Sequence, residues 1–298
     1  MLDYAALSAL AAVIREGSFE RAAQALFVTP SAVSQRIRAL EERVGCALVV
    51  RGQPCRATDT GRRLCQHVDR VRLLEQELQS ALPALAPEGL TRVALPIAVN
   101  ADSLATWFAP AVAAYAADAP VLMELMVDDQ DYTAEWLRSG AVLAAVTGTA
   151  RPPAGFNSRP LGAMRYLAAA SPAYVERHFA SGVGAGSLAR APSLVFNTKD
   201  DLQARWVRRL CHRDVELPRH VVPSPYAFVA AALAGMGWGL HPQALIASQL
   251  HDGSLVELVP ETPLDVQLYW QHARAASSLI DGLSRKVETA ATQALRPP

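Results

Sequence analysis

The chain has 298 residues, about half of them apolar, and its 28 basic and 28 acidic residues leave no net charge. This length exceeds one typical core, so we expect two or more compact units. A neutral chain holds nucleic acid only through a local basic patch. No apolar run is long enough to span a bilayer, and no signal-like segment follows Met1. The sequence therefore predicts a cytoplasmic protein with no membrane partner.

The amino-terminal segment carries the pattern of a small helical domain. Apolar residues at helical spacing predict helices over residues 4–15, 19–27 and 30–44. Ser18 and Thr29 are the expected N-caps, Pro30 suits a first helical position, and Gly45 ends the third helix. Two short helices are joined by a tight turn, and the second of these helices is basic. Two short strands with a Gly/Pro turn follow them. This order predicts a winged helix-turn-helix DNA-binding domain over residues 1–63.

The basic groups of this segment matter more by placement than by number. Residues 1–66 hold nine arginines against six acids, which is a modest excess. Serine and glutamine can read base edges, whereas arginine and backbone amides hold phosphates. We predict contacts to double-stranded DNA from Thr29, Pro30, Ser31, Ser34, Gln35, Arg36, Arg38, Arg51 and Arg56. The alternative is a solvated helix face with structural arginines.

A long amphipathic segment follows over residues 64–90. Its inward positions alternate in steps of four and three, which is the spacing of a coiled-coil seam. The apolar members are Leu64, Val68, Val71, Leu78 and Leu82. We predict a linker and dimerisation helix that a Pro/Gly-rich hinge ends. The alternative is an amphipathic helix that packs on its own domain.

Strands and helices alternate over residues 91–298, the predicted effector-binding domain. The expected helices cover residues 103–116, 131–138, 200–211, 225–234 and 277–295. The expected strands include VALPIAV, VLMELMV, AVLAAVTG, MRYLAAA, PSLVFN, RHVV and GWGLHP, with others near residues 255–270. This alternation predicts two parallel sheets with covering helices, and a ligand crevice at the carboxyl ends of the strands.

Acidic residues gather on the expected crevice rim. Between Arg92 and Arg138 the chain has seven acids and no Lys or Arg, and several acids follow strand ends. Such a rim concentrates cations, so the ligand should bring positive charge. We expect effector contacts from Asn100, Asp102, Ser103, Asp128, Asp129, Thr147, Asn197 and Ser224. The alternative is that Asp102 and Ser103 cap the helix and the other acids are solvated.

Motifs of catalysis and of cofactor binding are missing from the sequence. There is no nucleophile elbow, Walker loop, H-E-x-x-H helix or dinucleotide fingerprint. None of the four cysteines forms a C-x-x-C pair, and no metal spacing is found. We therefore expect no enzyme activity, no cofactor and no metal, and we expect reduced thiols, with a redox-sensing pair as the alternative.

The segment FERAAQALFVTPSAVSQRIRALEERVGCALVVR, followed by TDTG, resembles the amino terminus of LysR-type transcriptional regulators. The resemblance covers the whole chain. AVNADSLATW and the pair Tyr269-Trp270 are similar to the arginine- and lysine-responsive subgroup called ArgP, IciA or LysG. One departure is VPSPYAF, where Tyr226 replaces the acid expected in that subgroup.

The resemblance implies an α/β protein with an amino-terminal α-rich winged helix-turn-helix domain. Its effector domain would be periplasmic-binding-protein-like, with one subdomain over 91–161 and 267–298 and another over 162–266. It also implies a homodimer or homotetramer, a basic amino acid as effector, an exporter gene as target, and RNA polymerase as a further partner. A DNA-architectural or replication-inhibiting protein and a regulator of another metabolite are the open alternatives.

Overall fold

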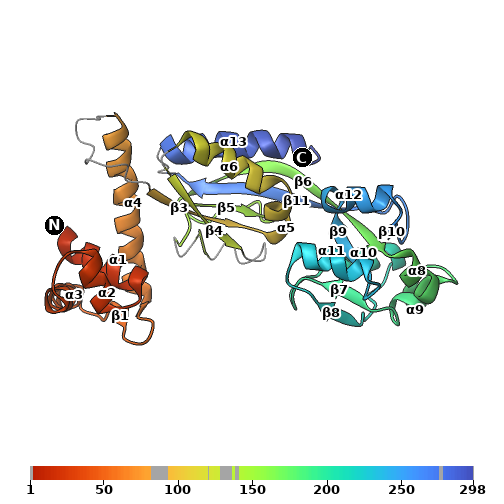
Figure 1. Cartoon of the computed structure of the whole chain (residues 1–298), viewed down its shortest axis with the longest axis horizontal. Helices are drawn as coiled ribbons and strands as arrows, with labels where there is room; N and C mark the ends of the chain where they lie inside the picture. Colours follow the sequence, from red (N-terminus) through yellow and green to blue (C-terminus); the bar gives the residue numbers. More distant parts are fainter. Residues whose placement is uncertain are drawn as a thin grey trace.

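The structure is a computed structural model, and it describes residues 3–81, 93–119, 121–127, 136–137, 141–274 and 278–297. Figure 1 shows a small helical unit at the amino terminus, the long helix α4 (Asp59–Ala81) beside it, and an α/β part with two lobes. None of the described helices is long and apolar enough to cross a membrane.

The amino-terminal unit has the predicted winged helix-turn-helix. Its helices are α1 (Tyr4–Glu16), α2 (Phe19–Ala25) and α3 (Pro30–Val44), and its wing strands are β1 (Val49–Val50) and β2 (Arg56–Ala57). The expected caps are confirmed. Ser18 Oγ accepts the backbone N–H of Arg21, Thr29 Oγ1 accepts that of Ala32, and Gly45 ends α3 in the left-handed conformation.

Helix α4 belongs in part to this first unit. It begins at Asp59, and Val68 is buried while Leu64 packs against the same core as α1 and α3. The packing of Val68 fits the alternative of a helix that packs on its own domain, which the four-three spacing also allows, and Leu64 is half-buried. Farther along, Leu74 and Leu78 are 56% and 52% exposed. Leu82 lies outside the described residues.

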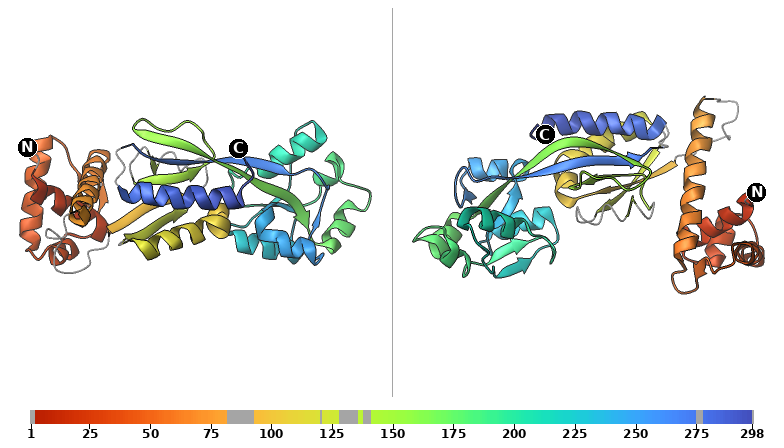
Figure 2. Two further views of the ribbon diagram at one scale, coloured as in Figure 1. Left: turned by 90° about the horizontal axis from the view of Figure 1, so that it is seen from above. Right: turned by 180° about the vertical axis from the view of Figure 1, so that it is seen from behind.

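Lobe I contains the parallel strands β3 (Val93–Val99), β4 (Val121–Val127) and β5 (Ala144–Thr147). Its helices α6 (Ala109–Asp118) and α13 (Ser278–Ala294) pack together on one face of the sheet, as Figure 2 shows. The short helix α5 (Ala101–Ser103) and the π turn η2 (Leu104–Phe108) lead from β3 into α6. The helix therefore starts before the predicted residue 103.

Two long strands link the lobes. β6 (Phe156–Ala170) and β11 (Leu264–Ala273) pair antiparallel along their length, and β11 also pairs antiparallel with β5. The prediction of purely parallel sheets is thus wrong. An alternating pattern of strands and helices does not reveal strands that run through both lobes and return.

Lobe II is built on the far end of β6, which pairs antiparallel with β9 (Gly239–Pro242) and β10 (Val256–Glu257). A parallel pair joins β7 (Ser193–Val195) and β8 (Arg219–Val221). Its helices are α8 (Pro172–Phe179), α9 (Ala185–Leu188), α10 (Leu202–Cys211), α11 (Pro225–Leu233) and α12 (Gln243–His251). The sequence reading missed α8, α9 and α12, which are short.

Candidate functional site

The predicted DNA-contacting residues of α3 lie on its outer face. The opposite face buries Val33, Ile37 and Leu40 in the core. Exposed along the outer face are Thr29, Pro30, Ser31, Gln35 and Arg38, and Ser34 and Arg36 are half-buried beside them. Amide, hydroxyl and guanidinium groups therefore stand together on one surface, which is the chemistry that a DNA groove requires.

The wing is fixed to this helix. Glu41 Oε1 on α3 accepts the backbone N–H groups of Leu48 and Val49, at 2.7 and 3.3 Å. The Arg51 guanidinium lies over the Phe19 ring, 5.4 Å from its centroid. Arg56 is exposed on β2. The two wing arginines are therefore carried on the same rigid unit as α3.

A second group of predicted residues lies where β3 ends and the helix begins. Asn100 and Ser103 are buried, and neither Asn100 Oδ1 nor Ser103 Oγ has a hydrogen-bond partner among the described residues. Asn100 occupies the N-cap position of α5, but its side chain makes no capping bond. Buried polar atoms in native proteins usually find partners, so unpartnered ones indicate a ligand or water.

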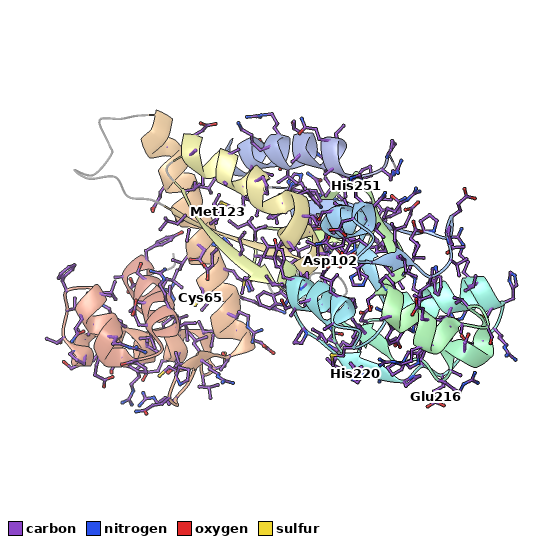
Figure 3. All side chains as sticks on the ribbon, turned by 45° about the vertical axis from the view of Figure 1, so that its right-hand side comes forward. Cys65, Asp102, Met123, Glu216, His220 and His251 are labelled. Carbon is purple, nitrogen blue, oxygen red and sulfur yellow. The ribbon has the colours of Figure 1, made fainter. Side chains whose placement is uncertain are left out.

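Asp102 lies between the lobes (Figure 3). Its Oδ2 accepts the hydroxyl of Tyr166, which is on β6, at 2.7 Å. Burial, and then the Asp102 charge, raise the pKa of the Tyr166 phenol, so Tyr166 stays a donor. The capping alternative for Asp102 is wrong, because Asp102 lies inside α5 rather than at its N-cap.

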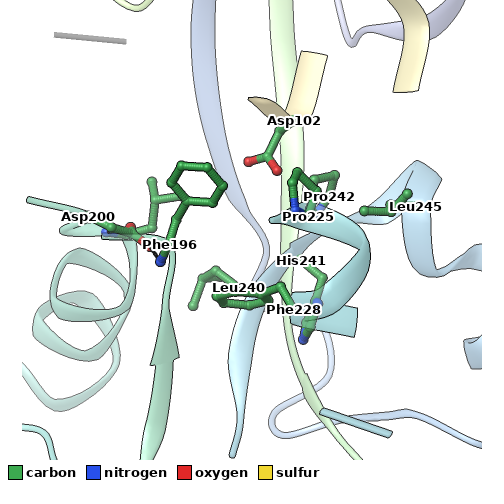
Figure 4. Close-up of a pocket in the computed structure, with 10 residues that line it drawn as sticks. Asp102, Phe196, Asp200, Pro225, Phe228, Leu240, His241, Pro242 and Leu245 are labelled. Carbon is green, nitrogen blue, oxygen red and sulfur yellow. Dashed lines mark hydrogen bonds between the residues drawn. The ribbon is translucent and has the colours of Figure 1, made fainter. Parts of the chain in front are cut away.

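Asp102 faces lobe II across a small cavity (Figure 4). The cavity has a volume of about 20 Å³, which is room for one water-sized group. Its lining contains two carboxylates and no lysine or arginine: Asp102, Phe196, Asp200, Leu202, Pro225, Phe228, Leu240, His241, Pro242 and Leu245. Burial lowers the pKa of His241 to about 4, so this imidazole is neutral at pH 7. The lining therefore has two acidic side chains and no side chain that is cationic at pH 7.

Asp200 is the lobe II carboxylate of this cavity. Its two oxygens accept backbone N–H groups of Phe196 and Leu202, at 2.8 and 3.1 Å, and these bonds hold the carboxylate in place. Asn197 lies in the same turn, where its Oδ1 accepts the N–H groups of Lys199 and Asp200.

The remaining predicted effector residues lie outside this cavity lining. Ser224 caps α11 by accepting the N–H of Ala227, and Thr147 is buried at the end of β5. Asp128 and Asp129 lie outside the described residues.

Comparisons with known proteins agree with both parts of this structure. Residues 4–62 match the family described as bacterial regulatory helix-turn-helix protein, lysR family, and residues 88–290 match the LysR substrate binding domain. The chain belongs to the LysR family of transcriptional regulators. The expected fold class is thereby confirmed, and so is the expectation of a regulator rather than an enzyme.

Proteins similar to this LysR-type regulator include ArgP and LysG regulators. The HTH-type transcriptional regulator ArgP of Pseudomonas fluorescens is 47% identical, over 100% of this chain and 99% of that protein. The crystal structure of ArgP from Mycobacterium tuberculosis has a TM-score of 0.87 at 44% identity, covering 100% of both chains. Full-length LysG from Corynebacterium glutamicum with bound effector Arg has a TM-score of 0.74 at 37% identity, covering 99% of this chain and 100% of that one.

Sequence reasoning missed two residues of this LysR-type regulator. Asp200 lies between strand β7 and helix α10, and Asp102 lies in the first turn of the helix after strand β3, so a carboxylate near a strand-to-helix junction was an available signal. Tyr226 was noted only as a departure from the subgroup. Its hydroxyl donates to the Ala105 carbonyl at 3.1 Å and so joins α11 of lobe II to η2 of lobe I.

The acceptor for Tyr226 is encoded in the π turn. In a π turn each carbonyl accepts from the N–H five residues later. For Ala105 that residue is Pro110, which has no N–H. The Ala105 carbonyl is thus left for a donor from the other lobe.

No group of three metal-ligating side chains occurs in the described part of the chain.

Proposed function

We propose that this regulator controls its DNA binding through a basic amino acid, arginine or lysine, held between the two lobes. The observation that carries the proposal is the pair of carboxylates, Asp102 from lobe I and Asp200 from lobe II, on one cavity whose lining has no cation. Two acidic side chains on one cavity favour a cationic group over an anionic one. The arginine bound to LysG of Corynebacterium glutamicum supports the same ligand class.

The volume of the carboxylate cavity limits the size of the ligand group that can enter it. About 20 Å³ accommodates a group the size of one water molecule, such as an ammonium, so a guanidinium or a whole amino acid requires the two lobes to stand farther apart than in this structure. The ligand's remaining polar atoms would then reach the unpartnered Asn100 and Ser103 near the start of the same helix. Thr147, Asn197 and Ser224 stay proposed contacts, as do Asp128 and Asp129. A ligand that touches both lobes stabilises the arrangement in which they face each other, and this differential affinity is the source of regulation.

The DNA side of the proposal uses the outer face of α3 in the major groove, with the wing arginines on the flanking backbone. The exposed half of α4, with Leu74 and Leu78, would join two subunits. A homodimer or homotetramer on a dyad operator, RNA polymerase as a partner, and an amino-acid exporter gene as the target complete the proposal. Arginine should change the affinity for the operator and not the affinity for random DNA, which separates a regulator from an architectural protein.

Calorimetric titration of the full chain with arginine and lysine tests the ligand site. Asp102→Asn keeps an acceptor for Tyr166 but removes the charge. A charge-assisted hydrogen bond contributes roughly 1.5–3 kcal/mol, so arginine affinity should fall by about 10- to 150-fold at an unchanged melting temperature. Asp200→Asn should weaken binding in the same direction.

The matched control is Asp201→Asn, one residue beyond the cavity carboxylate. Asp201 is exposed, and its side chain makes a long surface ion pair with Arg205, at 3.7 Å. Its substitution should leave arginine affinity unchanged. The proposal fails if Asp102→Asn binds arginine as the wild type does, or if glutamate binds more tightly than arginine.

A further inference from the structure

A second cavity lies at the junction of the lobes and shares part of its wall with the carboxylate cavity. Its volume is about 610 Å³, in the range of small-molecule sites. Lobe I supplies residues of η2 and the segment after α13, lobe II supplies the start of α12, and β6 runs between them. The full lining is Ala105, Thr106, Trp107, Ala163, Met164, Arg165, Pro242, Gln243, Ala244, Leu245, Ala247, Ala294, Leu295 and Arg296.

The charge of this lining is opposite to that of the cavity beside Asp102. It contains two arginines and no acid. Arg165 makes a two-pronged pair with Asp265, with N–O distances of 2.8 and 2.7 Å. The hydrogen bond from Arg165, and then the charges of Arg165, Arg296 and Arg209, lower the pKa of the Asp265 carboxyl. Asp265 lies outside the lining and is paired with Arg165, so Arg296 is the second basic side chain of the lining.

Helix α12 adds a further positive feature. Its N-cap, Pro242, makes no side-chain capping bond, and its first residues, Gln243, Ala244 and Leu245, line the cavity. The uncapped N–H groups and the helix dipole favour an anion at this end of a nine-residue helix. Most of the other lining side chains are apolar, so they suit a hydrocarbon body rather than a bare ion.

Arg296 is held in place by the backbone. Its N–H and carbonyl exchange hydrogen bonds with Ala163 on β6, at 3.0 and 2.9 Å. Gly162 permits this approach: its φ is +120°, and a Cβ there would collide with the Arg296 carbonyl. The segment after α13 is therefore a built wall of the cavity.

We propose that this second cavity binds a small organic carboxylate, with its carboxylate at Arg296 and the start of α12 and its apolar body against η2 and β6. Pro242 and Leu245 line both cavities, so an occupant of one contacts a wall of the other. Coupling between two ligands is reciprocal, and each should change the affinity of the other by the same factor. This coupling rests on the proposed function, whereas binding of the carboxylate by itself does not.

Hexanoate is the probe, with hexylammonium as the charge-reversed control and inorganic phosphate as the anion without an apolar body. Calorimetry on the full chain without arginine should give saturable hexanoate binding and none for hexylammonium. Arg296→Gln should lower the affinity for hexanoate by about five- to tenfold. Arg213→Gln changes an exposed arginine outside the cavity and should leave this affinity unchanged. Ala247→Phe should occupy part of the cavity and weaken hexanoate binding while leaving the fold intact, because Ala247 is exposed.

Three results would refute the proposed carboxylate site. Hexylammonium could bind with the same affinity as hexanoate, phosphate could compete with hexanoate at equal affinity, or Arg296→Gln and Arg213→Gln could lose equal amounts of hexanoate affinity. A titration with arginine at saturating hexanoate then tests the coupling, and an unchanged arginine affinity refutes it. If hexanoate binds but arginine does not, the proposed function fails and the carboxylate site stands.

Discussion

Removing the Tyr226 hydroxyl should loosen the contact between the lobes. The hydroxyl reaches from α11 to the Ala105 carbonyl of η2, and the neighbouring Pro225 lines the carboxylate cavity. A ligand between the lobes and this hydrogen bond therefore stabilise the same arrangement. Tyr226→Phe keeps the ring and deletes only the bond, so arginine should bind more weakly.

The structure sets the size of this effect. A neutral hydrogen bond contributes about 0.5–1.5 kcal/mol. This one is 3.1 Å long, and Tyr226 is 65% exposed, so water competes for both groups. We therefore expect the lower half of the range, which is about a two- to fivefold loss of affinity.

Calorimetry with arginine measures the loss, and Tyr174→Phe is the matched control. Tyr174 donates to the Pro192 carbonyl at 2.6 Å, and both residues lie within lobe II. Its substitution should lower the melting temperature and leave arginine affinity unchanged. An unchanged or higher affinity in Tyr226→Phe would refute the reasoning.

Three further expectations concern DNA, assembly and pH. Gln35→Ala should lower the discrimination between bases at one base pair by about 1–3 kcal/mol. Arg38→Ala should weaken binding to all DNA sequences alike. Footprinting on operator and random DNA distinguishes the two effects. Leu74→Arg with Leu78→Arg should give a folded protein that sediments as a smaller species and no longer protects a dyad site. His241 has a folded-state pKa near 4, below its ordinary 6.5, so the unfolded chain binds more protons between these values. Its contribution to stability is present above pH 6.5 and is lost as the pH falls. Urea unfolding should show a decrease of about 2 kcal/mol at pH 5 that His241→Asn reduces.

The winged helix-turn-helix could be predicted closely because its signals are local. Ser18, Thr29 and Gly45 cap and end their helices through bonds to nearby residues. In α4 the same spacing fits a partner subunit and the chain's own core, and only the tertiary packing of Val68 distinguishes them.

The links between the lobes could not be predicted in this way. The first half of β6 contains Pro160 and Gly162, which interrupt a strand pattern, yet pairing with β11 keeps it extended. The approach of Asp200 to Asp102 depends on the folding of two lobes, and no periodicity in the sequence encodes it. The expected position of Asp102 near a helix start was right, but its partner Tyr166 comes from a distant strand.

Because Val68 is buried beside α1, a movement of α4 also moves the winged helix-turn-helix domain, which is the DNA-reading head. Because the first half of α4 is part of that head, the head cannot swivel independently of the helix. Leu78 lies roughly 15 Å along the axis from Val68, at ~1.5 Å per residue. A tilt of about 10° over that length displaces the far end by about 3 Å, close to the ~3.4 Å rise of one base pair. A small change in how two such helices cross would therefore move each DNA-reading head by most of one base-pair step along the DNA.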